Sequence, residues 1–541
     1  MRSILLIFTV LVGFNLSAQK TSKLIHTAKG EMQKENYVKA VNILEPLTNQ
    51  KPVDKEALKL TGECFLNISG EEEKAMRYLE KAAGLYPLGK NPNLATLETH
   101  FYLAQALHMN YRFDQAMAIY ENLLNFAKQR ELVSAINREI NYVNNAIEMV
   151  KTPLEFKIIS LGSKVNSPFD EHSPLVAADE TELYFTSNRP LKGAKKDETE
   201  YFENIYVSYW LNDDWGEAEP LKLRGNYFGN RATVSLSADG NTMIIFQNDG
   251  FSGSLFETRK TFRGWTEPKP LAINSTNFNE THACYSPDGN ELWFTSDRPG
   301  GYGGKDIYIS HKLPDGSWGP PVNAGPEINT EWDEEAPFIS PDGSQLFFAS
   351  EGHSSMGGFD VFMCKKNEDE TWSKPENIGY PINTTNDDIF YLPTPDGQRV
   401  YYSSRRVGSM GGTDLYMLVF PDDDARALAV LAGYVFYGID EPGSDAVITI
   451  TDENKKLYGI YRPNQLTGKY VAILPTGIKY FLEIESDGYK TFTKEVNIPI
   501  RNVFGTRQTA TFTPNIFMEI EDVVETEEVD DTGQQPEPES N

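Results

Sequence analysis

A short motif that recurs five times between residues 178 and 403 constrains the fold more than any other feature of this sequence. In its clearest form, at residues 286–296 (SPDGNELWFTS), an Asp-Gly turn leads into a strand that is apolar on both faces. The aspartates of the copies are 60, 49, 54 and 54 residues apart: Asp179, Asp239, Asp288, Asp342 and Asp396. Asp-Gly favours a tight turn between paired strands, and a strand buried on both faces belongs between neighbouring sheets. The repeat therefore predicts a β-propeller.

A glycine-rich stretch at residues 300–305 (GGYGGK) looks at first like a phosphate-binding loop. Its second half and the residues that follow, 303–308 (GGKDIY), recur at residues 357–362 and 411–416, where Phe359 and Thr413 replace Lys305. A phosphate loop needs the lysine, a following Ser or Thr, and a helix, whereas this stretch leads into a strand. We therefore predict a hairpin turn, with glycines at positive φ and the aspartate bonding to local amides.

The two ends of the repeat region complement each other. After Tyr416 no tryptophan-containing segment follows, so the last repeat lacks an outer strand, whereas residues 154–161 form a spare strand at the start. A ring closes if one supplies the other, which removes the exposed sheet edges. We therefore expect a five-bladed propeller over residues 151–422. The motifs resemble the WD-like propeller repeats of TolB and its relatives over residues 154–420.

Residues 19–150 are rich in Ala, Leu, Glu and Lys at helical spacing. The same offsets of four and seven residues recur in three places: Ala40, Leu44, Leu47; Ala75, Leu79, Ala82; and Ala116, Tyr120, Leu123. Small residues at such positions let paired helices approach closely. The pattern resembles the tetratricopeptide repeat, which implies a solenoid with a groove for protein segments. An ordinary helical bundle is the alternative, and residues 131–149 are expected to form a solvating cap helix.

The region from 428 to 515 has short strands between Gly, Pro and Asp turns, and its apolar residues Ile448 and Ile450 alternate with polar ones. This pattern predicts a small β-sandwich. The order of Gly433, residues 468–470 (GKY) and residues 474–477 (LPTG) resembles the carboxypeptidase regulatory-like domain. That resemblance implies an accessory module without catalytic residues.

The chain ends and its charge suggest where the protein works. Arg2 and the apolar run at residues 4–14 precede small residues, and the run is shorter than the ~20 residues that span a bilayer. We therefore expect a cleaved signal peptide (1–18), export to the periplasm and no transmembrane span. Residues 516–541 are acidic and are predicted to be disordered. A net charge of −28 disfavours binding to nucleic acid or anionic lipid.

Each propeller repeat begins with an Asn that is followed by acidic residues, except the second repeat, which has Asn230 and Arg231. Equivalent positions of a propeller lie on one rim, so these carboxylates are expected to form an acidic collar: Asp170, Glu171, Glu280, Asp333, Glu334, Asp387 and Asp388. One interpretation is a site for calcium or a basic peptide, because clustered oxygen ligands suit hard cations. The other is that the Asn caps its turn and the carboxylates are solvated.

Glycan hydrolysis is a further alternative, because it needs two carboxylates with distinct roles at a set separation. Here the carboxylates recur at equivalent positions, which is typical of a repeat consensus, and no HExxH or GxSxG motif is present. We therefore expect no enzymatic activity, no catalytic residue and no cofactor other than the calcium considered above.

The domain order as a whole resembles the PorE-like cell-envelope proteins of Bacteroidota. The resemblance implies a non-enzymatic adaptor, associated with the outer membrane, that binds other envelope proteins such as a barrel of the type IX secretion or gliding machinery. Relatives continue into an OmpA-like domain that binds peptidoglycan, whereas this sequence ends in the acidic run. We therefore expect attachment to the wall through a partner. The alternative function is a propeller that binds glycan, peptidoglycan or a cation.

Overall fold

The computed structural model describes residues 21–519 except 52, 69, 192–201, 226, 228, 249–252, 262, 405, 407, 422–427, 439–440, 500–510 and 513–515. The predicted signal peptide and residues 520–541 of the predicted acidic tail lie outside the described residues. The chain divides into two compact units with their boundary between Leu428 and Ala429. None of the described helices combines the length and the apolarity that crossing a membrane would require.

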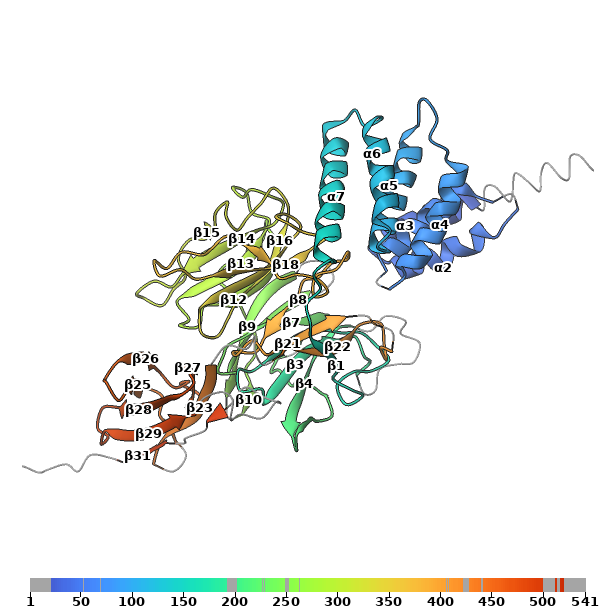
Figure 1. Ribbon diagram of the computed structural model, residues 1–541. Coiled ribbons are helices and arrows are strands. Elements are labelled where there is room, and N and C mark those ends of the chain that lie inside the picture. Colours follow the sequence, from blue (N-terminus) through green and yellow to red (C-terminus); the bar gives the residue numbers. More distant parts are fainter. Residues whose placement is uncertain are drawn as a thin grey trace, which may run out of the picture. The chain divides into compact units, whose positions relative to one another are not determined.

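Helices form the first part of the chain, as predicted (Figure 1). Residues 21–32 are helical, and six further helices follow in the described region: α2 (Tyr37–Thr48), α3 (Lys55–Leu66), α4 (Glu72–Leu85), α5 (Leu94–Met109), α6 (Phe113–Leu124) and α7 (Arg130–Met149). The side chain of Asp54 accepts hydrogen bonds from the first amides of α3, and Asn93 does the same for α5. These caps satisfy amides that the helix itself leaves without partners.

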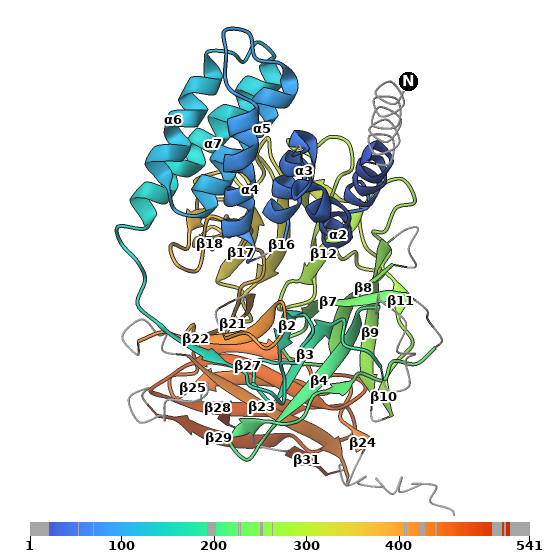
Figure 2. The ribbon, with the colours of Figure 1, turned by 90° about the vertical axis from the view of Figure 1, so that its right-hand side faces the viewer.

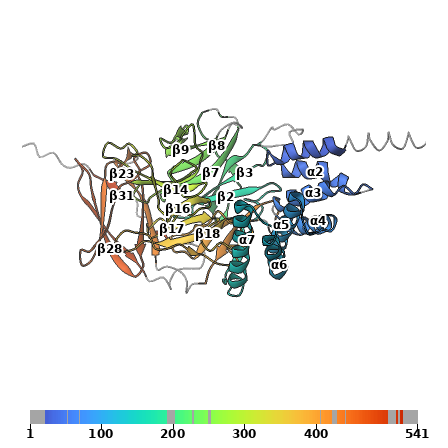
Figure 3. The same ribbon diagram turned by 90° about the horizontal axis from the view of Figure 1, so that it is seen from above.

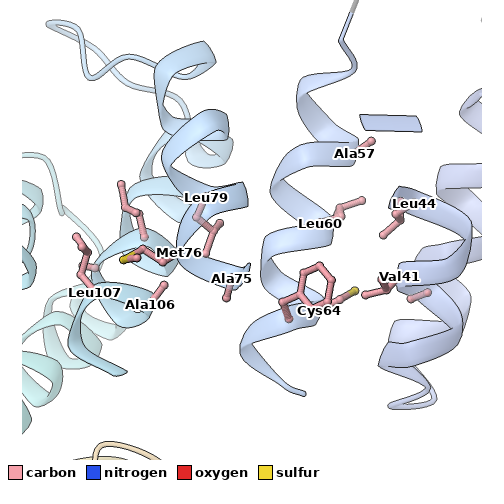
Figure 4. Packing of buried hydrophobic residues seen from close by; sticks show 14 of the residues in the cluster. Val41, Leu44, Ala57, Leu60, Cys64, Ala75, Met76, Leu79, Ala106 and Leu107 are labelled. Carbon is pink, nitrogen blue, oxygen red and sulfur yellow. The ribbon is translucent and has the colours of Figure 1, made fainter. Parts of the chain in front are cut away.

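The small residues predicted at the helix contacts, Ala40, Ala75 and Ala116, are completely buried, and so are Ala28 and Ala104 on neighbouring helices. Gly62 on α3 fills another of these positions, where an added Cβ would lie 2.5 Å from Cγ of Leu79 on α4. Figure 4 shows side chains of α2, α3 and α4 pointing toward one another, with Leu44, Leu60 and Leu79 among them. The recurring offsets therefore identified the core of the helical region.

Between residues 157 and 419 the described chain forms five antiparallel sheets. The first four have their strands in chain order from one edge: β2 (Glu171–Val176), β3 (Glu182–Ser187), β4 (Asn204–Leu211), β5 (Asp214–Trp215) and β6 (Glu219–Pro220); β7 (Asn230–Leu236), β8 (Thr242–Asn248), β9 (Gly253–Thr261), β10 (Gly264–Trp265) and β11 (Lys269–Pro270); β12 (Glu280–Tyr285), β13 (Glu291–Ser296), β14 (Asp306–His311) and β15 (Val322–Asn323); β16 (Glu334–Ile339), β17 (Gln345–Ser350), β18 (Asp360–Lys365) and β19 (Glu376–Asn377). This arrangement is consistent with a β-propeller, and we call each sheet a blade.

The fifth sheet closes the ring with the first strand of the chain. It contains β20 (Leu392–Pro393), β21 (Arg399–Ser404) and β22 (Asp414–Val419), and β1 (Lys157–Ser160) pairs with the outer side of β22. The register aligns Ser160 with Tyr416 and Lys157 with Val419. The predicted pairing of residues 154–161 with the strand at Tyr416 is therefore confirmed.

Helix α7 packs against the fourth blade, so the prediction of a solvating cap is wrong (Figures 2 and 3). Nη1 of Arg138 lies 2.9 Å from Oε2 of Glu351, and its guanidinium is 4.3 Å from the ring centroid of Trp332. The side chain of Asn145 donates to the carbonyl oxygen of Ser355 at 2.8 Å. The Tyr142 hydroxyl donates to the backbone carbonyl oxygen of Glu351. The sequence periodicity identified the helix but carried no information about this partner.

The second unit is a β-sandwich, as predicted. One sheet contains β23 (Leu428–Tyr437), β24 (Glu441–Pro442), β27 (Lys469–Pro475), β30 (Thr511–Phe512) and β31 (Ile516–Met518), and the other contains β25 (Val447–Asp452), β26 (Leu457–Tyr461), β28 (Ile478–Glu485) and β29 (Phe492–Ile498). Ile448 and Ile450 are fully buried in the shared core. Because β31 pairs with β23, residues 516–518 belong to the sandwich, and the predicted tail boundary at residue 516 is wrong.

Candidate functional site

The seven carboxylates of the predicted collar lie at equivalent positions of the repeat, at the start of the inner strand in the first, third and fourth blades and four to five residues before it in the fifth. The first carboxylate of each pair joins two blades. Oδ1 of Asp333 accepts the amide of Lys305 at 3.0 Å, Asp387 accepts that of Phe359 at 3.0 Å, and Asp170 accepts that of Thr413 at 2.8 Å. In each case the amide belongs to the preceding blade. These aspartates are therefore links between blades.

The second carboxylate of each pair stabilises the turn that precedes its own strand. Glu334 accepts the amide of Thr330 at 2.8 Å and the hydroxyl of Ser350 at 2.7 Å. The same turn amide is accepted by the other three second carboxylates: Glu171 from Ser167, Glu280 from Ser275, and Asp388 from Thr384. Glu171 and Glu334 are completely buried, so the interpretation as solvated carboxylates is wrong for these two, whereas Asp387 is exposed.

The recurring asparagines do not cap their own turns either. The side chain of Asn329 bonds both backbone groups of Ile307, accepting its amide at 2.8 Å and donating to its carbonyl oxygen at 2.9 Å. Asn383 makes the same pair of bonds to Val361 in the blade before it. Each asparagine thus extends the hydrogen-bond ladder between neighbouring blades, which local turn chemistry could not reveal.

The glycine-rich turns were predicted to have an aspartate that bonds to local amides and glycines with positive φ. The structure confirms the first point and corrects part of the second. Asp414 accepts the local amides of Met410 and Gly411, as expected. Gly300 has a φ of +98°, as predicted, but the recurring pairs at 303–304, 357–358 and 411–412 are not among the residues with positive φ. Glycine is needed because the chains approach closely: a Cβ on Gly303 would lie 1.9 Å from the carbonyl oxygen of Trp332, and one on Gly358 would lie 1.9 Å from Oδ1 of Asp387.

In the first and third blades an arginine compensates the buried second carboxylate, and the fourth blade lacks this arginine. Arg189 lies 2.8 Å from Glu171, and Arg298 lies 2.9 Å from Glu280. In the fourth blade Gly352 stands at that position, and Glu334 has only hydroxyl and amide partners. Burial therefore raises the pKa of Glu334 to about 7.

The raised pKa makes Glu334 a source of pH-dependent stability. Because the folded-state value of about 7 lies above the ordinary 4.5, the contribution of this carboxyl is complete below pH 4.5 and is lost as the pH rises through 7. The loss amounts to about 3 kcal/mol at most. We therefore expect the melting temperature of Glu334→Gln to rise relative to wild type between pH 5 and pH 8.5, as measured by calorimetry. Glu331→Gln, which changes an exposed neighbour, serves as control, and a difference that stays constant with pH would contradict the assignment.

The second blade retains the blade link with different residues. Asn230 replaces aspartate, and its Oδ1 accepts the amide of Glu203 at 2.9 Å. Arg231 replaces the second carboxylate, and its guanidinium lies 4.5 Å from the ring of Tyr227. The collar is therefore a structural repeat with one cationic position. Among the described residues no three His, Cys, Asp or Glu side chains converge as metal ligands, and calcium binding stays a prediction.

A polar cluster nearer the propeller axis was missed by the sequence interpretation. Glu335, one residue beyond the collar, accepts Nδ1 of His282 at 2.6 Å, Nζ of Lys305 at 2.5 Å and the hydroxyl of Thr281 at 2.7 Å. Although burial opposes ionisation, His282 and Lys305 lower the pKa of Glu335 to about 2. The sequence does distinguish these residues, because they depart from the repeat. The other copies have no glutamate at the position of Glu335 and no lysine at the position of Lys305.

No family model and no curated protein sequence matches this chain. Solved structures with a similar fold include a protein assigned as TolB from Agrobacterium tumefaciens, which is 17% identical and covers 49% of this chain and 98% of that chain at a TM-score of 0.32. An alpha-L-arabinofuranosidase from Lactobacillus brevis is 14% identical, with coverages of 49% and 94% and a TM-score of 0.32. A glycoside hydrolase is 12% identical, with coverages of 51% and 94% and a TM-score of 0.32. Each likeness extends over about half of this chain.

Proposed function

We propose that this chain is a non-enzymatic scaffold of the bacterial cell envelope, exported to the periplasm and associated with the outer membrane. A three-repeat tetratricopeptide solenoid and a five-bladed propeller would present separate surfaces to partner proteins, and the regulatory-like sandwich would act as an accessory module. The observation that carries this proposal is the α7 junction, where Arg138, Tyr142 and Asn145 bind the fourth blade. Such a junction suits a protein that holds two partners at a fixed separation.

The rim chemistry supports a scaffold in preference to a hydrolase. A general acid and a general base need carboxylates that reach a substrate. The collar carboxylates instead accept the amides of their own turns or of the preceding blade, as Asp333 and Glu334 illustrate. The domain order favours a partner from the type IX secretion or gliding machinery, such as its outer-membrane barrel.

One row of side chains across the helical layer suits a basic protein segment. The row contains two ion pairs: Lys29 contacts Glu56 at 2.7 Å, and Lys59 contacts Glu98. Its third carboxylate, Glu63, accepts a hydrogen bond from the Tyr102 hydroxyl at 3.4 Å. The row therefore has three carboxylates and two ammonium groups. Burial raises the pKa of Glu63, and the neighbouring carboxylate of Glu98 adds to this effect. A lysine or arginine of a partner would compensate the excess charge.

Site-specific crosslinking tests this function. We expect a photoreactive residue in place of Tyr102 to capture an integral outer-membrane protein in intact cells. The matched control position is Arg77, which pairs with Glu73 on α4, outside the row. A basic peptide from the captured protein should bind the purified chain about ten-fold more tightly than it binds the Glu63→Gln variant. Equal capture from both positions, or equal binding by the variant, would contradict the proposal.

A further inference from the structure

The inner strands of all five blades enclose a cavity of about 120 Å³ on the propeller axis. Each blade contributes the same position of its inner segment to the lining: Pro174, Val234, Ala283, Pro337 and Tyr391. An apolar cavity of about 150 Å³ is enough to hold a benzene molecule. The axial cavity is slightly smaller than this and is thus close to the size of one small ring.

Aromatic rings form part of the cavity wall. Phe347 packs against Tyr391 with ring centroids 5.2 Å apart, and Phe338 lies 6.3 Å from Phe347 on its other side. Phe390 contacts the imidazole of His282 at 5.6 Å. Because ring edges and faces attract one another at such distances, these walls favour an aromatic body over an aliphatic one.

His282 also lines the cavity and is the one imidazole among its lining residues. Its Nδ1 is bonded to Oε2 of Glu335, so Nε2 is the ring nitrogen left for a ligand. An ionised carboxylate cannot donate, so the imidazole must donate from Nδ1, and this bond fixes the orientation of the ring. Glu335 faces two cationic groups, because Lys305 binds its other oxygen. Asp333 and Asp297 also lie near Lys305, so the contact that would select an acid is the one to Nε2 of His282.

The cluster is not required by the repeat. The residues at the position of Glu335 in the other blades are His172, Ala232, Thr281 and Ile389. Four inner strands also carry a register shift here, and Ser173 and Ala336 have φ near +50°. Because these shifts recur in four of the five blades, they belong to the repeat and set the direction of the side chains beside them. What the fold needs recurs in every blade, so residues that occur once at the axis point to a ligand.

We propose that the axial cavity binds a small aromatic carboxylic acid. Its ring lies among Phe338, Phe347 and Tyr391, and its carboxylate pairs with Nε2–H of His282. The high negative charge of the chain does not prevent this, because exposed charges farther than about 8–10 Å are largely screened by salt, whereas His282 lines the cavity itself.

The test uses the full chain with benzoate and phenylacetate as probes, and with benzyl alcohol and benzylamine as controls of the same size. We expect saturable binding of an acid by calorimetry and by ligand-observed NMR, with benzylamine not binding. His282→Ala should weaken acid binding about ten-fold or more, because a charge-assisted hydrogen bond is lost. His172→Ala is the matched control, since this histidine is paired with Glu203 and does not line the cavity. Its variant should bind like wild type.

A second variant separates binding from folding. His282→Gln keeps an amide that can bond to Glu335 but carries no positive charge, and it should lose acid binding while its melting temperature stays near that of wild type. Absence of saturable binding by both acids overturns the proposal. Equal binding of the acids and benzylamine, or unchanged acid binding by both folded His282 variants, overturns it as well.

Discussion

Replacement of Gly411 by alanine is expected to lower the free energy of unfolding of the propeller by about 3 kcal/mol. An added Cβ would lie 1.8 Å from the carbonyl oxygen of Phe169, a distance that requires the backbone to move. The contact lies at the seam of the ring, where the amide of Thr413 is also bonded to Asp170. The change therefore separates the last blade from the first.

Urea unfolding followed by tryptophan fluorescence measures this effect. The matched control is Gly84→Ala on α4, where an added Cβ meets nothing within 4 Å. This control should be neutral or stabilising by up to about 1 kcal/mol, because alanine is the better helix former. If Gly411→Ala unfolds at the same urea concentration as wild type, the seam is not as close as described.

The regular spacing of the recurring motifs predicted the ring, because each copy repeats the same physical requirements. Asp-Gly turns gave the hairpins, doubly apolar strands such as Leu292–Phe294 gave the buried middle of each blade, and the spare strand at residues 154–161 gave the closure. These features are local or periodic, and a single sequence records both. The same holds for the buried alanines of the helical region.

Contacts between blades were beyond the reach of that reasoning. Asn329 resembles a turn cap in the sequence, yet its partners are the backbone groups of Ile307, 22 residues away. Gly303 resembles a positive-φ turn residue, yet the carbonyl oxygen of Trp332 decides its identity. In both cases the constraint comes from a segment that becomes a neighbour only after folding.

The cluster of His282, Lys305 and Glu335 was missed for a different reason. A search for recurring residues treats a departure such as Glu335 as noise, because the average of the five copies removes it. In a repeat protein the consensus encodes the fold, so individual chemistry is expected among the exceptions. His282, Lys305 and Glu335 could have been singled out by subtracting the repeat from the sequence.

A second exception to the repeat leads to the other prediction of large effect. Glu180 occupies the glycine position of its Asp-Gly turn, with φ of +52°, where the other copies have Gly240, Gly289, Gly343 and Gly397 at +68° to +72°. Its carboxylate binds the guanidinium of Arg399 through both oxygens, at 3.0 and 2.7 Å, and accepts the hydroxyl of Tyr401 at 2.9 Å. The side chains of Glu180 and Arg399 are 2% and 1% exposed. This ion pair therefore joins the first blade to the last in a site that is buried away from solvent.

We expect Glu180→Gly to destabilise the protein by about 2 to 4 kcal/mol, although it restores the glycine of the repeat. Removing one partner of a buried pair costs about 3–5 kcal/mol, and relief of the left-handed backbone returns only about 1 kcal/mol. Arg399→Gln alone should be similarly destabilising, because it leaves the carboxylate of Glu180 buried without its cation.

The double variant Glu180→Gly/Arg399→Gln decides whether the pair or the individual residues matter. It reproduces the residues at the junction of the fourth and fifth blades, where Gln345 and Gly397 stand at these two positions. If the ion pair is the cause, the double variant should recover about 2 kcal/mol or more relative to the sum of the single changes in a double-mutant cycle. Lys479→Gln, which breaks the exposed pair with Glu495, sets the scale of an ordinary surface contact at under about 1 kcal/mol. Additive losses in the cycle would mean that Glu180 and Arg399 act separately and that strain, rather than pairing, governs this turn.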